Sequence, residues 1–173
     1  MIRKLWRLYT LLSMLVVALA LVAVGVTFLV NQKTDKTATV TAIIDGDTFV
    51  IDSGESVRLI GIDSPERGDP YYFEARDKLS SLVKNETVLL VRDKENKDQY
   101  GRLLRYVWRS NIFINAEMVS SGYATVYPYP PNLKYSDMFD DCQSEAINSN
   151  IGIWYKPREP LKKMSLEDFL GND

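Results

Sequence analysis

The sequence predicts a mainly β domain with helices (α+β): a five-stranded β-barrel with three α-helices, preceded by one N-terminal transmembrane helix. Three observations predict this arrangement. Short runs rich in β-branched residues are separated by turn signals between positions 37 and 108. Apolar residues take helical spacing once within this region and twice after it. An uncharged apolar stretch precedes all of these elements, and a length of 173 residues suits about one domain.

The apolar stretch contains no charged residue from Leu8 to Val30. As a helix rising about 1.5 Å per residue, it would be roughly 34 Å long, enough for a hydrocarbon core of about 30 Å. Basic residues precede it, so the positive-inside rule places the amino end in the cytoplasm and the rest outside. We therefore expect a membrane-anchored protein whose domain is extracytoplasmic, at the cell surface. The alternative is a secreted protein released from a cleaved signal peptide, although the apolar part of such peptides usually runs only about 7–15 residues.

Composition excludes several functional classes. The first 30 residues hold three of the 21 basic residues and no acid, which leaves the remainder with 18 basic and 23 acidic residues, a formal charge of −5. This balance excludes a polybasic nucleic-acid coat protein. The single cysteine, Cys142, excludes an intramolecular disulfide and a cysteine-rich zinc module. Because histidine is absent, Ser-His-Asp hydrolases, Cys-His hydrolases and histidine-ligated zinc sites are excluded as well.

The chain divides into four segments. Residues 1–30 are the anchor or signal segment, 31–37 a polar linker, 38–156 the folded domain, and 157–173 a loose C-terminal tail. Five runs in the domain predict strands: Thr37–Ile44, Thr48–Ile51, Val57–Ile62, Thr87–Val91 and Leu103–Trp108. Three further runs predict helices: Tyr71–Val83, Ile114–Ser121 and Ser136–Ser149. Five short strands with one helix inserted after the third are typical of a small barrel of the oligonucleotide-binding (OB) type.

Three short segments place charged residues beside glycine or proline: 45–48 (DGDT), 58–66 (RLIGIDSPE) and 98–102 (DQYGR). Each one alone has an ordinary explanation. Segment 45–48 is typical of a turn whose carboxylates bind backbone amides, 63–65 (DSP) of the end of a strand, and 100–102 (YGR) of a loop that enters a strand. In a continuous third strand, Arg58 would face one side of the sheet and Asp63 the other. Asp63 would lie at the end of that strand, where it can meet Asp47 from the neighbouring hairpin. Glu66, just past Pro65, can approach the same point.

Carboxylates without histidine suit a hard cation such as Ca²⁺, which prefers oxygen ligands and tolerates irregular geometry. The spacing is not that of an EF-hand loop. Nearby arginines suit a phosphate, because a planar guanidinium group binds two phosphate oxygens at once. A metal ion, a carboxylate and paired arginines are together the parts required for phosphodiester hydrolysis.

These segments, in this order, closely resemble the staphylococcal nuclease (thermonuclease) family. The resemblance runs from about Thr39 to Trp154 and includes the spacing from arginine to Asp-x-Pro-Glu, which is its specific part. It implies an OB-type barrel with three helices and a single Ca²⁺ cofactor, ligated by Asp47, Asp63 and the carbonyl oxygen of Ser64.

The resemblance also implies the roles of three charged residues. Glu66 would be the general base, or the residue that positions the attacking water. Arg58 and Arg102 would hold the scissile phosphate and stabilise its extra charge in the transition state. The implied activity is Ca²⁺-dependent hydrolysis of DNA and RNA with little sequence specificity, leaving a 3′-phosphate.

Three tyrosines match the nucleotide-contacting tyrosines of the family: Tyr100, Tyr127 and Tyr129. The alternative for them is ordinary packing at the edge of the domain. The loop between Glu66 and Tyr71 is shorter than in the best-known members and lacks their lysines, which bears on affinity rather than on the reaction class. The alternative function is a non-catalytic OB-fold module that binds single-stranded nucleic acid, although binding alone does not require the full set of arginines and carboxylates. No protein partner is inferred.

Overall fold

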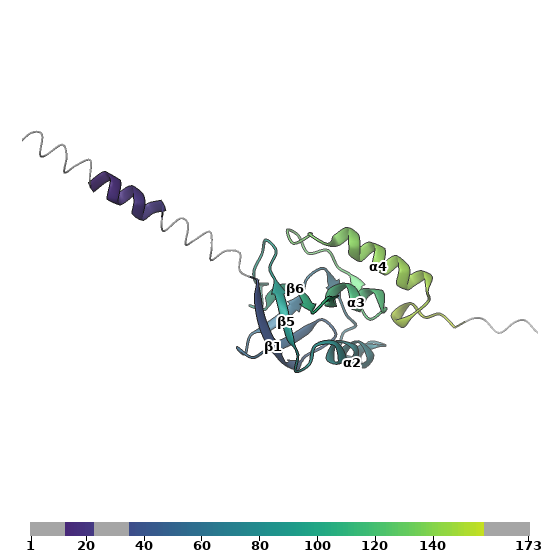
Figure 1. The fold of residues 1–173 in the computed structure, drawn as a ribbon. Helices are drawn as coiled ribbons and strands as arrows, with labels where there is room; N and C mark the ends of the chain where they lie inside the picture. The colour runs from purple at the N-terminus through teal and green to yellow at the C-terminus, as the bar shows by residue number, and fades with distance from the viewer. Residues whose placement is uncertain (1–12, 23–34, 158–173) are drawn as a thin grey trace, which may run out of the picture.

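The structure is a computed structural model and describes residues 13–22 and 35–157 (Figure 1). Residues 13–22 are helical and exposed. Among the helices of the described residues, none combines the length and the apolar character needed to cross a membrane. Most of the expected anchor, the linker up to residue 34, and the tail from residue 158 onwards lie outside the described residues.

Five strands form a closed barrel: β1 (Lys36–Ile43), β2 (Thr48–Ile51), β3 (Ser56–Leu59), β5 (Thr87–Val91) and β6 (Leu103–Arg109). They are hydrogen-bonded in the order β3-β2-β1-β5-β6, and all of these neighbours are antiparallel. A parallel pairing between β3 and β6, with Val57 opposite Leu103, closes the ring. The predicted five-stranded barrel of the OB type is therefore confirmed.

The core fills the inside of this barrel. Side chains alternate along a strand, so every second residue of a strand points inward. Ala38 and Val40 of β1, Phe49 and Ile51 of β2, and Val57 of β3 are all at most 4% exposed. The β-branched and aromatic residues that predicted the strands are thus the ones that the barrel buries.

Three helices cover the barrel, as predicted: α2 (Tyr72–Val83), α3 (Ile114–Ser120) and α4 (Ser136–Asn148). Ala75 and Leu79 on the inner face of α2 are fully buried. α3 packs on β6, and α4 lies against the outer side of α3 (Figure 1). A short 3-10 helix, Gly152–Trp154, follows α4.

The third strand differs from the prediction of one continuous run from Val57 to Ile62. β3 ends at Leu59, the backbone turns at Gly61 with φ of 81°, and Ile62–Asp63 forms a separate short strand, β4. β4 pairs antiparallel with β8 (Thr125–Val126), and a second short strand, β7 (Ile112–Phe113), pairs with β6. The turn requires glycine for a second reason, because an added Cβ would lie 2.6 Å from the Phe139 ring.

This turn changes which side chains share a face. The prediction that Arg58 and Asp63 lie on opposite sides of one strand is wrong, since the alternation is interrupted between them. The turn at Gly61 redirects Asp63, and the Arg58 guanidinium reaches its carboxylate.

Candidate active site

A hollow of about 300 Å³ lies between β3, β4, the turn from β1 to β2, the loop before β6 and the segment after β8. Every predicted site residue except Ser64 contributes to its wall: Asp47, Arg58, Asp63, Glu66, Tyr100, Arg102, Tyr127 and Tyr129. These residues are spread over about 80 positions of the sequence, and the closed barrel brings them together.

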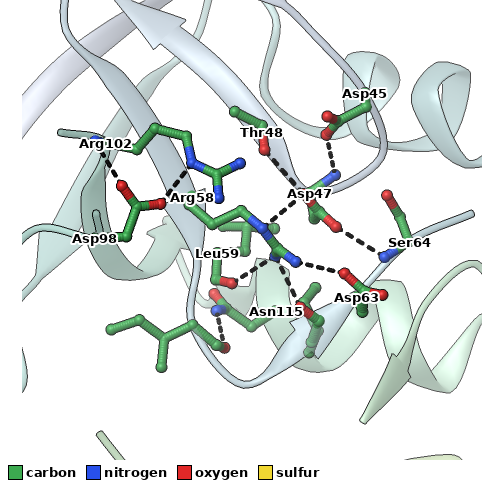
Figure 2. A network of polar contacts seen from close by, with 12 residues as sticks. Asp45, Asp47, Thr48, Arg58, Leu59, Asp63, Ser64, Asp98, Arg102 and Asn115 are labelled. Carbon is green, nitrogen blue, oxygen red and sulfur yellow. Dashed lines mark hydrogen bonds and ion pairs between the residues drawn. The ribbon is translucent and has the colours of Figure 1, made fainter. Parts of the chain in front are cut away.

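The turn between β1 and β2 holds Asp47 in a fixed position. Asp47 is 4% exposed, and its Oδ1 accepts a hydrogen bond of 2.9 Å from the Thr48 hydroxyl. Its Oδ2 accepts the backbone N–H of Ser64 at 2.8 Å, while its own N–H donates to Asp45 Oδ1 at 3.0 Å (Figure 2). Gly46 permits this close approach, because an added Cβ would lie 2.7 Å from the Ser64 Cβ.

Arg58, on β3, bridges the two carboxylates among the three predicted metal ligands. Its Nε lies 3.1 Å from Asp47 Oδ1, and its Nη2 lies 2.7 Å from Asp63 Oδ1. Its Nη1 donates to the carbonyl oxygens of Leu59 at 2.9 Å and Ile62 at 2.7 Å (Figure 2). The turn at Gly61 presents both carbonyl groups to the same side chain. Three of the five guanidinium N–H groups thus donate hydrogen bonds, and the Nε side of the group forms the ion pair with Asp47.

Arg102, directly before β6, is held differently. Its Nε donates to Asp98 Oδ2 at 2.6 Å, and its backbone N–H donates to Asp98 Oδ1 at 3.0 Å. Asp98 Oδ1 also accepts the backbone N–H of Tyr100 at 2.9 Å. No described residue accepts a hydrogen bond from either terminal amino group of Arg102. The pair of donors at the end of this side chain is therefore available to a ligand.

Negative charge accumulates on the other wall of the hollow. Burial, and after it the charge of neighbouring Asp47, raise the pKa of Asp45 to about 6. Burial also raises the pKa of Asp63; Arg58 opposes this rise, and the charges of Asp47 and Glu66 add to it. The positive charge of Arg58 therefore does not fully offset the crowded carboxylates.

Comparison with known proteins decides the family. The family model described as "Staphylococcal nuclease homologue" matches residues 56–156, more than half of the chain. A thermonuclease of Staphylococcus intermedius is 39% identical over 121 residues, 65% of this chain and 72% of the relative. The chain belongs to the staphylococcal nuclease family.

Two further relatives match a larger part of this chain. A protein called micrococcal nuclease, from Shigella flexneri, is 34% identical over 161 residues, 84% of this chain and 91% of its own. Endonuclease YncB of Bacillus subtilis (strain 168) is 36% identical over 137 residues, 73% of this chain and 65% of its own. Like these nuclease relatives, the chain is a phosphodiester-hydrolysing endonuclease.

The donors in the hollow fit a hard cation by type. They are carboxylate oxygens, which Ca²⁺ prefers as ligands. The pKa values of Asp45 and Asp63 are raised by burial first and by the charges of neighbouring carboxylates after it. Within residues 13–22 and 35–157, however, no group of three or more carboxylate, histidine or cysteine side chains is gathered closely enough to hold a metal ion. A cation bound by Asp47 and Asp63 would therefore take its remaining ligands from backbone carbonyl groups and water. Ser64 lies beside Asp63, and it contacts Asp47 through its N–H.

The three tyrosines line the rim of the hollow but differ in exposure. Tyr100 is 75% exposed and Tyr127 is 55% exposed. Tyr129 packs partly against the core. Packing at the edge therefore accounts for part of Tyr129. Tyr100 and Tyr127 are largely exposed, and the Arg102 guanidinium lies over the Tyr100 ring, 5.4 Å from its centroid.

Sequence reasoning missed two buried asparagines that support the site. Asn115, in the first turn of α3, donates to the Ile60 carbonyl at 2.9 Å and accepts the Val107 N–H at 2.9 Å. It thereby fixes the turn that carries Arg58 towards Asp63. Asn132 accepts the Glu95 N–H at 2.7 Å and so joins the segment after β8 to the loop before Arg102. The only signal for Asn115 was a polar residue at a core-facing position of an amphipathic helix.

Proposed function

We propose that this nuclease is Ca²⁺-dependent and hydrolyses both DNA and RNA with little sequence specificity. The observation that carries the proposal is the shared hollow, where the free amino groups of Arg102 face a wall that contains Asp47, Asp63 and the exposed Glu66. Hard oxygen donors without histidine favour Ca²⁺, and irregular ligand geometry disfavours Mg²⁺, which demands near-octahedral coordination.

The residues of the hollow divide the work of hydrolysis. Ca²⁺ on Asp47 and Asp63 would supply positive charge near the phosphate. The Arg102 amino groups bind two phosphate oxygens and stabilise the charge that grows on them in the transition state. Glu66 takes a proton from the attacking water as the new O–P bond forms. The bond from phosphorus to the 5′ oxygen of the next nucleotide breaks, and that oxygen takes a proton from solvent water, which leaves a 3′-phosphate and a 5′-hydroxyl.

Digestion of plasmid DNA and single-stranded RNA by the full-length protein in mild detergent tests this proposal. We expect cutting of both substrates with Ca²⁺, little cutting with Mg²⁺, and none with chelator. Equal rates with the two metals would contradict the assigned site. Binding of single strands without any cleavage would instead support the non-catalytic OB-fold module.

The location of the protein is a separate proposal. The uncharged stretch from Leu8 to Val30 and the basic residues before it support an anchor with the nuclease domain outside the cytoplasm. The full-length protein should then stay in the membrane fraction after high-salt and carbonate washes, and protease added to spheroplasts should remove the domain. Recovery of a soluble product beginning near Leu21 would establish a cleaved signal peptide and a secreted enzyme.

A further inference from the structure

Glu66 is the first residue of a tight turn, and Asp69, the last residue of this turn, forms hydrogen bonds with both the N–H and the carbonyl group of Glu66. The Asp69 backbone N–H donates to the Glu66 carbonyl at 2.9 Å, and Asp69 Oδ2 accepts the Glu66 N–H at 3.2 Å. Gly68, at the third position of this four-residue turn, has φ of 107°, a conformation that glycine adopts without strain. Both backbone polar groups of Glu66 are thus bound by one residue.

The chain before Glu66 is fixed as well. The Ser64 N–H is bound by the buried Asp47 carboxylate, and Pro65 has its φ locked by its ring. The Glu66 side chain, in contrast, is exposed and forms no hydrogen bond or ion pair with any described residue. The backbone of Glu66 is therefore held at both ends, while its carboxylate is free to meet water in the hollow.

We propose that Asp69 is a positioning residue that acts through Glu66, an inference that rests on the proposed function. A general base must lie within about 2.6–3.2 Å of the proton donor, and an exposed loop does not keep that distance by itself. Asp69 is not part of the wall of the hollow. It affects the reaction through the hydrogen bond to the Glu66 N–H. This bond fixes the backbone of Glu66, and thereby the point from which its side chain extends towards the hollow.

The test uses three variants of the full-length protein. Asp69→Ala removes the acceptor, whereas Asp69→Asn removes the charge and keeps an oxygen that can accept the Glu66 N–H. Asp77→Ala removes an exposed carboxylate of α2 that has no hydrogen bond or ion pair with a described residue, and it serves as the matched control. Each is assayed for kcat and KM on one oligonucleotide at saturating Ca²⁺, alone and combined with Glu66→Gln.

We expect Asp69→Ala to lower kcat about three- to tenfold, the range set by losing one solvent-accessible hydrogen bond, with KM unchanged. Asp69→Asn and Asp77→Ala should keep the wild-type kcat. In the Glu66→Gln background, Asp69→Ala should have no further effect, because a residue that acts only through Glu66 has nothing left to position.

Three results would overturn the proposal: Asp69→Ala with wild-type kcat, Asp69→Asn as slow as Asp69→Ala, or an equal loss from Asp69→Ala in the Glu66→Gln background. Each result counts against the proposal only if the wild type cuts nucleic acid and Glu66→Gln lowers its rate. Failure of the proposed function is distinct from these results, since the wild type would not cut or Glu66→Gln would have no effect.

Discussion

Replacing Asp98 by asparagine tests how strongly the activity depends on the orientation of Arg102. The Asp98 side chain is 5% exposed and accepts three hydrogen bonds, from the Arg102 Nε, the Arg102 N–H and the Tyr100 N–H. Asparagine keeps one acceptor oxygen for the two backbone donors. Its amide NH₂ group, however, would face the Nε–H of Arg102, so the charge-assisted bond of 2.6 Å is lost.

The size of the effect follows from that bond. A hydrogen bond to a charged group contributes about 1.5–3 kcal/mol, and the Arg102 side chain is 32% exposed, so solvent reduces this value. We expect the free energy of unfolding to fall by about 1–2 kcal/mol. Turnover should fall about 10–100-fold, because a displacement of about 1 Å in a phosphate-binding group can cost about 100-fold in rate. KM should change little, since Arg102 keeps its charge.

The assay pairs initial rates on a fluorogenic oligonucleotide with urea unfolding. The control is Glu95→Gln, which replaces an exposed carboxylate by a carboxamide in the same loop. It should alter neither the turnover nor the free energy of unfolding. A variant at Asp98 that loses stability but keeps wild-type turnover would refute the reasoning, because Arg102 would then need no support.

The pH dependence of stability gives an independent check. Burial raises the pKa of Asp98, but the hydrogen bonds and charge of Arg102 outweigh it, and the net pKa is lower than usual. A lowered pKa in the folded state stabilises the fold above the ordinary carboxyl pKa, and this contribution is lost as the pH falls through the folded pKa. The stability difference between wild type and Asp98→Asn should therefore narrow below about pH 4.

Three further outcomes are expected. Arg58→Lys keeps a charge but loses the planar guanidinium that contacts Asp47, Asp63 and two backbone carbonyl groups, so the rate should fall about 100-fold and far more than binding weakens; a loss below tenfold would show that the site does not need this ordering. Glu66→Gln should lower the rate of cutting, while a non-cleavable nucleotide still binds to the variant with Ca²⁺. Since histidine is absent, the activity of the wild type should rise towards alkaline pH without a step near pH 6.5. Asn115→Ala leaves the buried Val107 N–H and Ile60 carbonyl unsatisfied, so urea unfolding should show a loss of about 2–5 kcal/mol, and a loss below 1 kcal/mol would mean that water replaces the amide.

The barrel and its three helices could be predicted because their signals are local. Runs such as Thr37–Ile44 are rich in β-branched residues and so predict a strand from their own sequence. The observed bounds differ from the predicted ones by about one residue in most elements. The break at Gly61 could not be predicted in this way. Its causes are the Phe139 ring and the Asn115 amide, which lie 78 and 54 positions further along the chain.

The site shows the same division. The three charged segments identified which residues belong together, and the hollow brings them together. Their order in space depends on contacts that no spacing reveals. The Arg58 guanidinium lies between Asp47 and Asp63 because the chain turns at Gly61. Asp98 binds Arg102, four residues further along the chain, because the loop before β6 brings the two side chains together.

These contacts give the two arginines different tasks, although the sequence predicts the same one for both. Arg58 donates to Asp63 and to two backbone carbonyl groups, and its Nε is paired with Asp47, so that most of its guanidinium is already engaged within the protein. Arg102 uses only its Nε for Asp98 and keeps both terminal amino groups free of described partners. We therefore expect Arg102 to be the residue that binds a phosphate through two donors. Arg58 offsets the charge of the carboxylate wall, and it can offer a second donor only when its Nη2 leaves Asp63.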